Sequence, residues 1–88
     1  KALREDTRKV ESGETELLKA EAIKKTKAAL DKLPENLKMV LILREYAELN
    51  YKEIGRVLGI TEGNVKVRVF RAREQLAKLI GENDVYLP

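Results

Sequence analysis

Apolar residues recur every three or four positions along most of the chain, which is the period of a helix with one buried face. The first such face predicts a helix over 15–32, and its inward positions are Leu18, Ala22, Thr26, Ala29, Leu30 and Leu33. Pro34 cannot extend this helix and suits the first turn of the next one, expected over 34–46. The run MVLIL at 39–43 is apolar on every side, so this second helix is either buried on several sides or presents one side to a partner.

Two further helices are predicted around a glycine turn. Asn50 and Glu53 have the spacing of a capping box at the start of a third helix. Gly59 fits the left-handed residue that ends this helix, and Thr61 fits the N-cap of a fourth helix that continues to about Ile80. Two short helices joined in this way are typical of a helix-turn-helix, which sets its second helix into the major groove of DNA.

A second glycine indicates that the two helices cross closely. Gly55 lies four residues before Gly59, at a point where only a small side chain fits between closely packed helices. Because glycine costs about 1 kcal/mol of helix propensity relative to alanine, its presence inside a helix indicates a packing requirement. An ordinary helical hairpin that happens to contain a glycine is the alternative.

The fourth helix has two contrasting faces. A stripe at spacings of four and three is expected to be buried, and consists of Val65, Val69, Ala72, Leu76 and Leu79. Positions outside this stripe predict a DNA-binding surface made of Thr61, Glu62, Gly63, Asn64, Lys66, Val67, Arg68, Phe70, Arg71 and Arg73. Residues near the start of such a helix reach base edges, and the later cations meet phosphates.

Several residues of this surface have a second interpretation. Asn64 either bonds an adenine edge or helps to cap the helix, and Glu62 either accepts from a cytosine amine or interacts with the helix dipole. Arg68 lies beside the buried stripe, where a structural ion pair is as reasonable as a DNA contact. Val67 and Phe70 either meet thymine methyl groups or pack on another protein. The other cations are DNA contacts or part of a solvated face.

We expect one all-α domain of four helices without a sheet, ending in a winged-helix-like or homeodomain-like helix-turn-helix. The length of 88 residues suffices for one small domain, and its expected bounds are 15–81. The polar residues 1–14 predict a linker or frayed tail, with an extra short helix as the alternative. Residues 82–88 have no strong periodicity and predict a C-terminal tail.

Composition narrows the classes of function. The net charge is +3, and cations outnumber carboxylates on the fourth helix, which favours an anionic partner. The chain has no cysteine and no histidine, so disulfides, thiolate metal ligands and the usual neutral-pH acid–base residue are missing. An enzyme, a cofactor and a metal site are therefore not expected. No apolar run approaches the ~20 residues of a membrane span and no signal peptide is visible, so a cytoplasmic protein is expected.

Three segments carry a family resemblance: LDKLPENLKMVLILREY, ELNYKEIGRVLGI and GNVKVRVFRAREQL. With their Leu-Pro opening, the Tyr-x-Glu-Ile before the turn and the closing Arg-Ala-Arg, they resemble region 4 of bacterial sigma factors of the extracytoplasmic-function type (group IV). The resemblance implies binding of 61–73 to the minus-35 element of promoter DNA, docking on the β flap of RNA polymerase, and a possible anti-sigma factor. It also implies a polymerase or anti-sigma contact through Leu37, Val40, Leu41 and Ile42.

Two other interpretations remain open. The output domain of LuxR-type regulators has a similar Lys-Glu-Ile-x-x-x-Leu-Gly-Ile stretch, but it normally lacks the Leu-Pro opening and the Arg-Ala-Arg-x-x-Leu ending. A helical protein-interaction module that does not bind DNA would use Val67 and Phe70 in a protein interface. A titration against duplex DNA at two salt concentrations separates this module from both DNA-binding interpretations.

Overall fold

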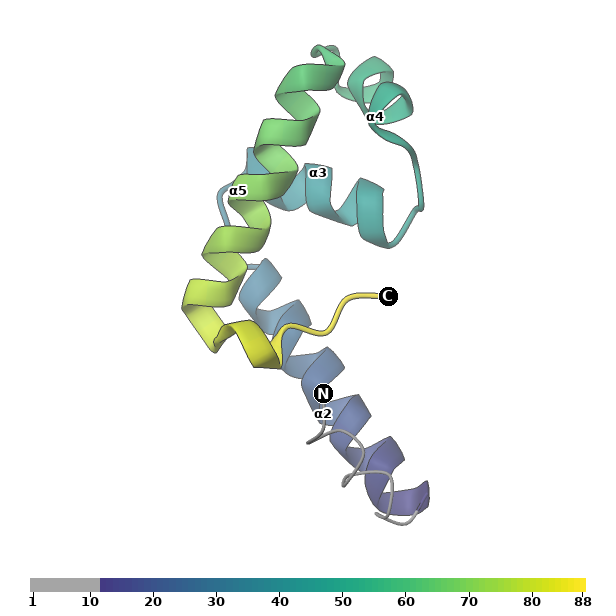
Figure 1. Ribbon diagram of the computed structural model, residues 1–88, viewed down its shortest axis with the longest axis vertical. Coiled ribbons are helices and arrows are strands. Elements are labelled where there is room, and N and C mark those ends of the chain that lie inside the picture. The colour runs from purple at the N-terminus through teal and green to yellow at the C-terminus, as the bar shows by residue number, and fades with distance from the viewer. Residues whose placement is uncertain (1–11) are drawn as a thin grey trace.

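The computed structural model describes residues 12–88, with side chains from residue 16 onward. Its elements are α2 (Ser12–Leu30), α3 (Glu35–Glu45), α4 (Tyr51–Leu58), α5 (Glu62–Ile80) and the 3₁₀ helix η1 (Glu82–Asp84). Figure 1 shows α5 as a long axis, with α4 at one end, α3 across its middle and α2 at the other end. The expected all-α fold is confirmed, and the described part contains no strand. None of its helices is long and apolar enough to cross a lipid bilayer.

Local hydrogen bonds set the boundaries of α4 and α5. The Asn50 side chain accepts the Glu53 N–H at 2.8 Å, and the Glu53 carboxylate accepts the Asn50 N–H at 2.8 Å, so the capping box is confirmed. Gly59 ends α4 in the left-handed region, with a φ of 73°. The Thr61 hydroxyl accepts the Asn64 N–H at 3.1 Å and caps α5. These bonds satisfy backbone groups that helix ends otherwise leave without partners, and they determine where the turn lies.

Gly55 lies where α4 approaches the turn most closely. A Cβ atom placed on Gly55 would lie 2.7 Å from the carbonyl oxygen of Ile60, so any larger residue must displace the backbone. The predicted close approach is confirmed. Gly55 approaches the backbone of the turn. The Ile60 N–H donates to the Gly55 carbonyl at 3.0 Å, and this hydrogen bond also stabilises the turn.

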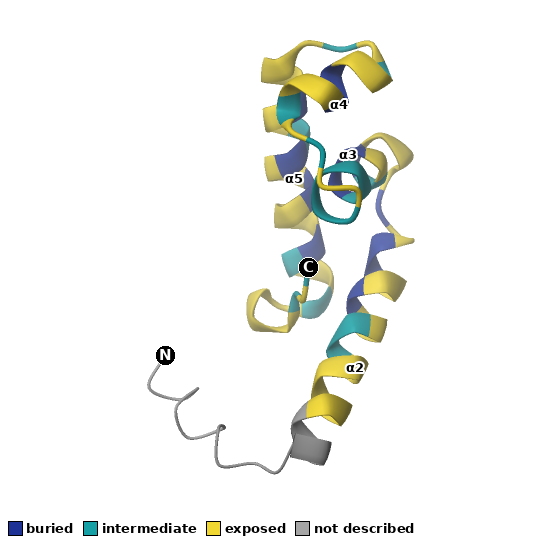
Figure 2. Cartoon of the chain, turned by 90° about the vertical axis from the view of Figure 1, so that its right-hand side faces the viewer, coloured by how far each residue is buried: buried dark blue, intermediate teal, exposed yellow. Residues whose placement is uncertain are grey.

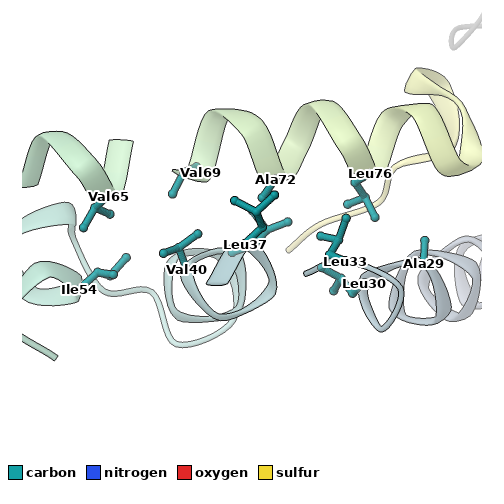
Figure 3. Packing of buried hydrophobic residues seen from close by; sticks show 11 residues of the cluster. Ala29, Leu30, Leu33, Leu37, Val40, Ile54, Val65, Val69, Ala72 and Leu76 are labelled. Carbon is teal, nitrogen blue, oxygen red and sulfur yellow. The ribbon is translucent and has the colours of Figure 1, made fainter. Parts of the chain in front are cut away.

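The apolar core runs along one side of α5. Figure 3 shows Val65 beside Ile54 of α4, Val69 beside Val40 of α3, and Leu76 towards the end of α2. The buried apolar residues are Ala29, Leu30, Leu33, Leu37, Val40, Leu41, Ile54, Val65, Val69, Ala72 and Leu76. Burying side chains of this size contributes about 1.5–3 kcal/mol each, so α5 joins the other three helices chiefly through this stripe.

The predicted stripe is correct over four of its five positions. Leu79 was expected to be buried, but 47% of its surface is exposed, whereas Ile80 packs against the core. The spacing of three from Leu76 to Leu79 and the spacing of four from Leu76 to Ile80 are equally compatible with a helix. Only the position of the neighbouring elements selects Ile80.

The predicted inner face of the first helix is wrong at its N-terminal end. Leu18 is 60% exposed, because the first half of α2 extends beyond the other elements (Figures 1 and 2). Further along α2, Ala29 and Leu30 are buried as expected. The helix also begins at Ser12, three residues before the expected start. Residues 1–11 of the expected N-terminal tail lie outside the described residues.

The segment after α5 packs against the domain. Gly81 ends α5 with a φ of 92°, and η1 follows immediately. Beyond η1, Val85 and Leu87 are partly buried against the core. The contacts of this segment with α2 join residues about 60 positions apart, so no local periodicity indicates them.

Candidate nucleic-acid interface

The predicted DNA-binding residues lie on the sides of α5 that are turned away from the core and on the turn before this helix. Those exposed to solvent are Thr61, Glu62, Gly63, Asn64, Lys66, Val67, Phe70, Arg71 and Arg73. Arg68 is half-buried at the edge of this face. Figure 2 shows the exposed turns of α5 alternating with the buried positions that face α3 and α4. We call this set the α5 outer face.

Packing on the opposite side holds the α5 outer face towards solvent. Val65, Val69 and Ala72 are buried against α3 and α4, so rotation of α5 about its axis would expose them. The close approach at Gly55 fixes how near α4 lies to the start of α5. A helix held in this way presents its first turns to solvent. Recognition helices that enter a major groove have this arrangement.

The start of α5 has its cap from Thr61, which leaves the Asn64 side chain free of that task. The Thr61 hydroxyl accepts from the backbone N–H of Asn64, and the Asn64 carboxamide itself is exposed. Glu62 lies in the first turn, where its charge suits the helix dipole. The Asn64 side chain is therefore not the cap of α5, and it stays exposed to solvent.

The cations of the α5 outer face differ in their ion pairing. Arg73 forms an ion pair with Glu45 of α3, and this carboxylate is largely buried. Arg71 is exposed. Because an arginine paired with a carboxylate presents less net charge to DNA, Arg71 is the better candidate for a DNA contact than Arg73.

Tyr51 is a neighbour of this surface that the sequence analysis did not select. Its ring lies at the start of α4, with the Arg44 guanidinium carbon 5.0 Å and the Lys66 ammonium 5.9 Å from its centroid. Arg44 also donates to the Leu49 carbonyl at 3.4 Å. Both cation–ring distances permit attraction to the ring face. No local spacing could have indicated this cluster, because its members belong to three different helices.

Two cations of α4 also adjoin the α5 outer face. Lys52 and Arg56 line a depression together with Thr61, Glu62 and Asn64. No residue of α4 was among those predicted from the sequence to contact DNA. Its basic residues at positions 52 and 56 were a usable signal, because the first helix of a helix-turn-helix crosses the DNA backbone.

Two apolar side chains on the α5 outer face are strongly exposed. Phe70 has 68% of its surface in solvent, and Val67 is also exposed. Single exposed apolar side chains are common on protein surfaces, so exposure by itself does not identify a partner. Both remain candidates for thymine methyl contact or for a protein contact.

Three of the four residues proposed for polymerase or anti-sigma contact lie in the core. Leu37, Val40 and Leu41 are buried, so a docked protein cannot reach them without opening the domain. The apolar run at 39–43 is mostly explained by burial between α5 and the other helices. Met39 is exposed, whereas Ile42 and Leu43 are half-buried and Leu43 packs against the core, so the accessible part of this run is mainly Met39 and Ile42.

Two groups, one on α3 and one at its C-terminal end, have pKa values above their usual range. A hydrogen bond from Lys38 to Asp31, with a nitrogen–oxygen distance of 2.9 Å, and the charge of Asp31 raise the pKa of Lys38. Burial, followed by the charge of Glu45, raises the pKa of Tyr46. Neither shift places a proton-transfer group beside the proposed DNA surface.

Comparison with known proteins agrees with this geometry. The family described as Sigma-70, region 4 matches residues 23–76, which include α3, α4 and most of α5. The chain is 37% identical over 71 residues to the RNA polymerase sigma-H factor of Pseudomonas aeruginosa, covering 81% of this chain and 37% of that protein. It is 36% identical over 73 residues to the ECF RNA polymerase sigma-E factor of Haemophilus influenzae, covering 83% and 39%.

A shorter match is more similar. Over 47 residues the chain is 43% identical to the ECF RNA polymerase sigma-E factor of Escherichia coli, covering 53% of this chain and 25% of that protein. The chain thus spans less than two fifths of the length of these relatives. The match to more than half of its residues, together with the helix-turn-helix described above, shows that the chain belongs to the Sigma-70, region 4 family.

Proposed function

We propose that this chain is the promoter-binding region of an extracytoplasmic-function sigma factor. It binds the minus-35 element of duplex promoter DNA with α5 in the major groove and thereby directs RNA polymerase to start transcription. The observation that carries the proposal is the α5 outer face, a protruding row of polar and cationic residues at the start of a capped helix. The chain has no catalytic role of its own in this proposal.

The proposed contacts divide by position along α5. Asn64 and Lys66, near the start of the helix, face base edges, and Arg71 lies one to two turns further on. Lys52 and Arg56 of α4 meet the phosphates beside the groove, because they flank the same depression as Thr61 and Asn64. Tyr51 supports Lys66 by holding its ammonium near the ring.

A DNA titration tests the proposal. A duplex enriched from a random-sequence pool is titrated with the chain at about 50 and about 200 mM salt, and contacts to several phosphates predict an affinity at least about tenfold lower at the higher salt. Arg71→Ala is expected to weaken binding by about 1–3 kcal/mol if Arg71 reads a base. Lys24→Ala, which removes one positive charge from an exposed position on α2, is the matched control and should bind normally.

The titration also decides against the alternatives. A chain that binds no duplex even at low salt would be a protein-interaction module, with Phe70 and Val67 covered by a protein. Equal losses of DNA affinity for Arg71→Ala and Lys24→Ala would show that only the net charge matters. Arg71 would then not contact a base.

Contact with RNA polymerase is a second part of the proposal. Its β flap is proposed to dock on the accessible apolar surface of α3 at Met39 and Ile42, since neighbouring apolar residues of that helix are buried. Ile42→Asp is expected to lower binding to purified bacterial core polymerase while DNA affinity stays unchanged. An anti-sigma factor would compete for the same surface, and unchanged polymerase binding by Ile42→Asp would move the contact elsewhere.

A further inference from the structure

The C-terminal segment 82–88 crosses the domain as a separate layer. Gly81 ends α5, and the segment then turns back past α2 (Figure 1, yellow). Its last residues reach the side of α3, because Tyr86 and Pro88 line a small cavity together with Ile23 of α2 and Tyr46 at the end of α3. The segment therefore bridges α2 and the C-terminal end of α3.

A buried hydroxyl anchors this segment to α2. Thr26 is completely buried, and its hydroxyl accepts the Tyr86 N–H at 2.9 Å and donates to the Asp84 carbonyl at 3.4 Å. The hydroxyl therefore acts as donor and as acceptor towards the backbone of the C-terminal segment. A threonine at this position of an apolar helix face would otherwise leave a buried polar group without a partner, which is costly.

Two further contacts close the segment over the core. Lys25 and Asp84 form an ion pair at 3.1 Å, with both side chains partly exposed. Val85 and Leu87 pack against the core from outside. Val85 and Leu87 also line a depression together with Phe70 and later residues of α5. In the described part of the chain, none of the polar contacts of the segment involves α4 or α5, so losing them leaves the caps and the turn of the helix-turn-helix in place.

We propose that residues 82–88 form a strap that opens and closes independently of the helix-turn-helix and controls how firmly α2 is held. When the strap is closed, α2 has a fixed direction relative to α5. When it opens, α2 is held by α5 and by its short connection to α3, and the apolar surface beneath Val85 and Leu87 becomes accessible. Segments with few buried apolar contacts are the ones that open locally in native proteins. In this strap the apolar side chains that pack against the core are Val85 and Leu87.

Amide hydrogen exchange of the full 88-residue chain tests the strap. Thr26→Val keeps the shape of the side chain but removes both hydrogen bonds, and we expect amides at 23–30 in α2 to exchange at least tenfold faster. Amides of α4 and of 62–72 should keep their exchange rates. Thr26→Ser retains the hydroxyl and should stay close to the unmodified chain. Uniform acceleration of all helices, or no acceleration in α2, would overturn the proposal.

A second pair of variants avoids changing the core. Tyr86→Pro removes the donor N–H at an exposed residue, and Val85 before it already has the extended conformation that precedes proline, with φ −72° and ψ 122°. Tyr86→Ala keeps the N–H and is the control. The strap predicts faster exchange at 23–30 for Tyr86→Pro than for Tyr86→Ala, and equal rates would show that this bond does not hold α2. The result does not depend on DNA binding, so it stands or falls separately from the proposed function.

Discussion

The two ends of α5 are held by different kinds of interaction. At its start, the capping residues and the glycine turn act over three to five positions of sequence. At its end, the chain is held by α2 and the strap, through hydrogen bonds that join residues 58 and 60 positions apart. The first kind leaves a signature in the sequence and the second does not. The end of α5 that is proposed to bind DNA is therefore specified by residues near one another in sequence, and the α2 end depends on the assembled domain.

The largest expected effect distinguishes a buried from an exposed leucine near the α2 end of α5. Leu76→Ala should lower the free energy of unfolding by about 2–5 kcal/mol, because Leu76 is fully buried and the substitution leaves a cavity. Leu79→Ala, one turn further on and half exposed, should cost less than about 1 kcal/mol. Urea unfolding of both variants measures the difference. Similar losses would mean that α5 is rotated from the orientation described.

A pair of glycine substitutions tests the end of α5 that is specified by residues near one another in sequence. Gly55→Ala places a methyl group against the Ile60 carbonyl and should destabilise the domain by about 1–3 kcal/mol. Gly63→Ala has open space around the new methyl group, and it should stabilise α5 by up to about 1 kcal/mol through helix propensity. Thermal unfolding of the two variants measures both the expected loss and the expected gain of stability. A stable Gly55→Ala variant would show that the turn lies further from α4.

The capping box should contribute less to the free energy of unfolding than the close approach at Gly55 does. Asn50→Ala removes the side chain that accepts the Glu53 N–H, with an expected loss of about 1 kcal/mol. Asn36→Ala, at an exposed position of α3, is the control and should change stability by less than about 0.5 kcal/mol. Equal values for the two variants would contradict the role of Asn50 as a cap.

The ion pair of the strap is expected to have the smallest effect. Lys25→Ala should change the free energy of unfolding by about 0–1 kcal/mol, since the pair with Asp84 is partly exposed. The difference from the unmodified chain should shrink further in high salt, because salt screens exposed charges. Measuring unfolding in low and high salt checks this. A large, salt-independent loss would instead indicate a packing role for the aliphatic part of Lys25.

The predictions that succeeded share a physical basis. Capping at Asn50 and Thr61, the left-handed Gly59 and the close approach at Gly55 depend on the chemistry of residues near one another in sequence. The stripe of α5 was also predictable up to Leu76, because its alternatives would have buried charges. These features establish both the helix-turn-helix and the composition of the α5 outer face.

Other features could not be derived from local patterns. The spacing of Leu18 fits a buried face, yet Leu18 is exposed because nothing in the described part covers that end of α2. Glu48 adopts a φ of 59° in the loop before α4, where the path between two packed helices overrides its preference. The ion pair of Arg73 with Glu45 joins positions 28 apart, so its effect on the candidate interface is visible only in the folded domain.

The sequence by itself determined the helices, their caps, the turn and the residues available for a DNA-binding face. These depend on backbone hydrogen bonding and helical periodicity, which act within a few residues. Only the tertiary structure decided which part of the apolar run at 39–43 stays accessible, which cations are already paired, and how 82–88 closes over α2. These depend on which distant surfaces meet, because burial and pairing are properties of the assembled domain and not of any one segment.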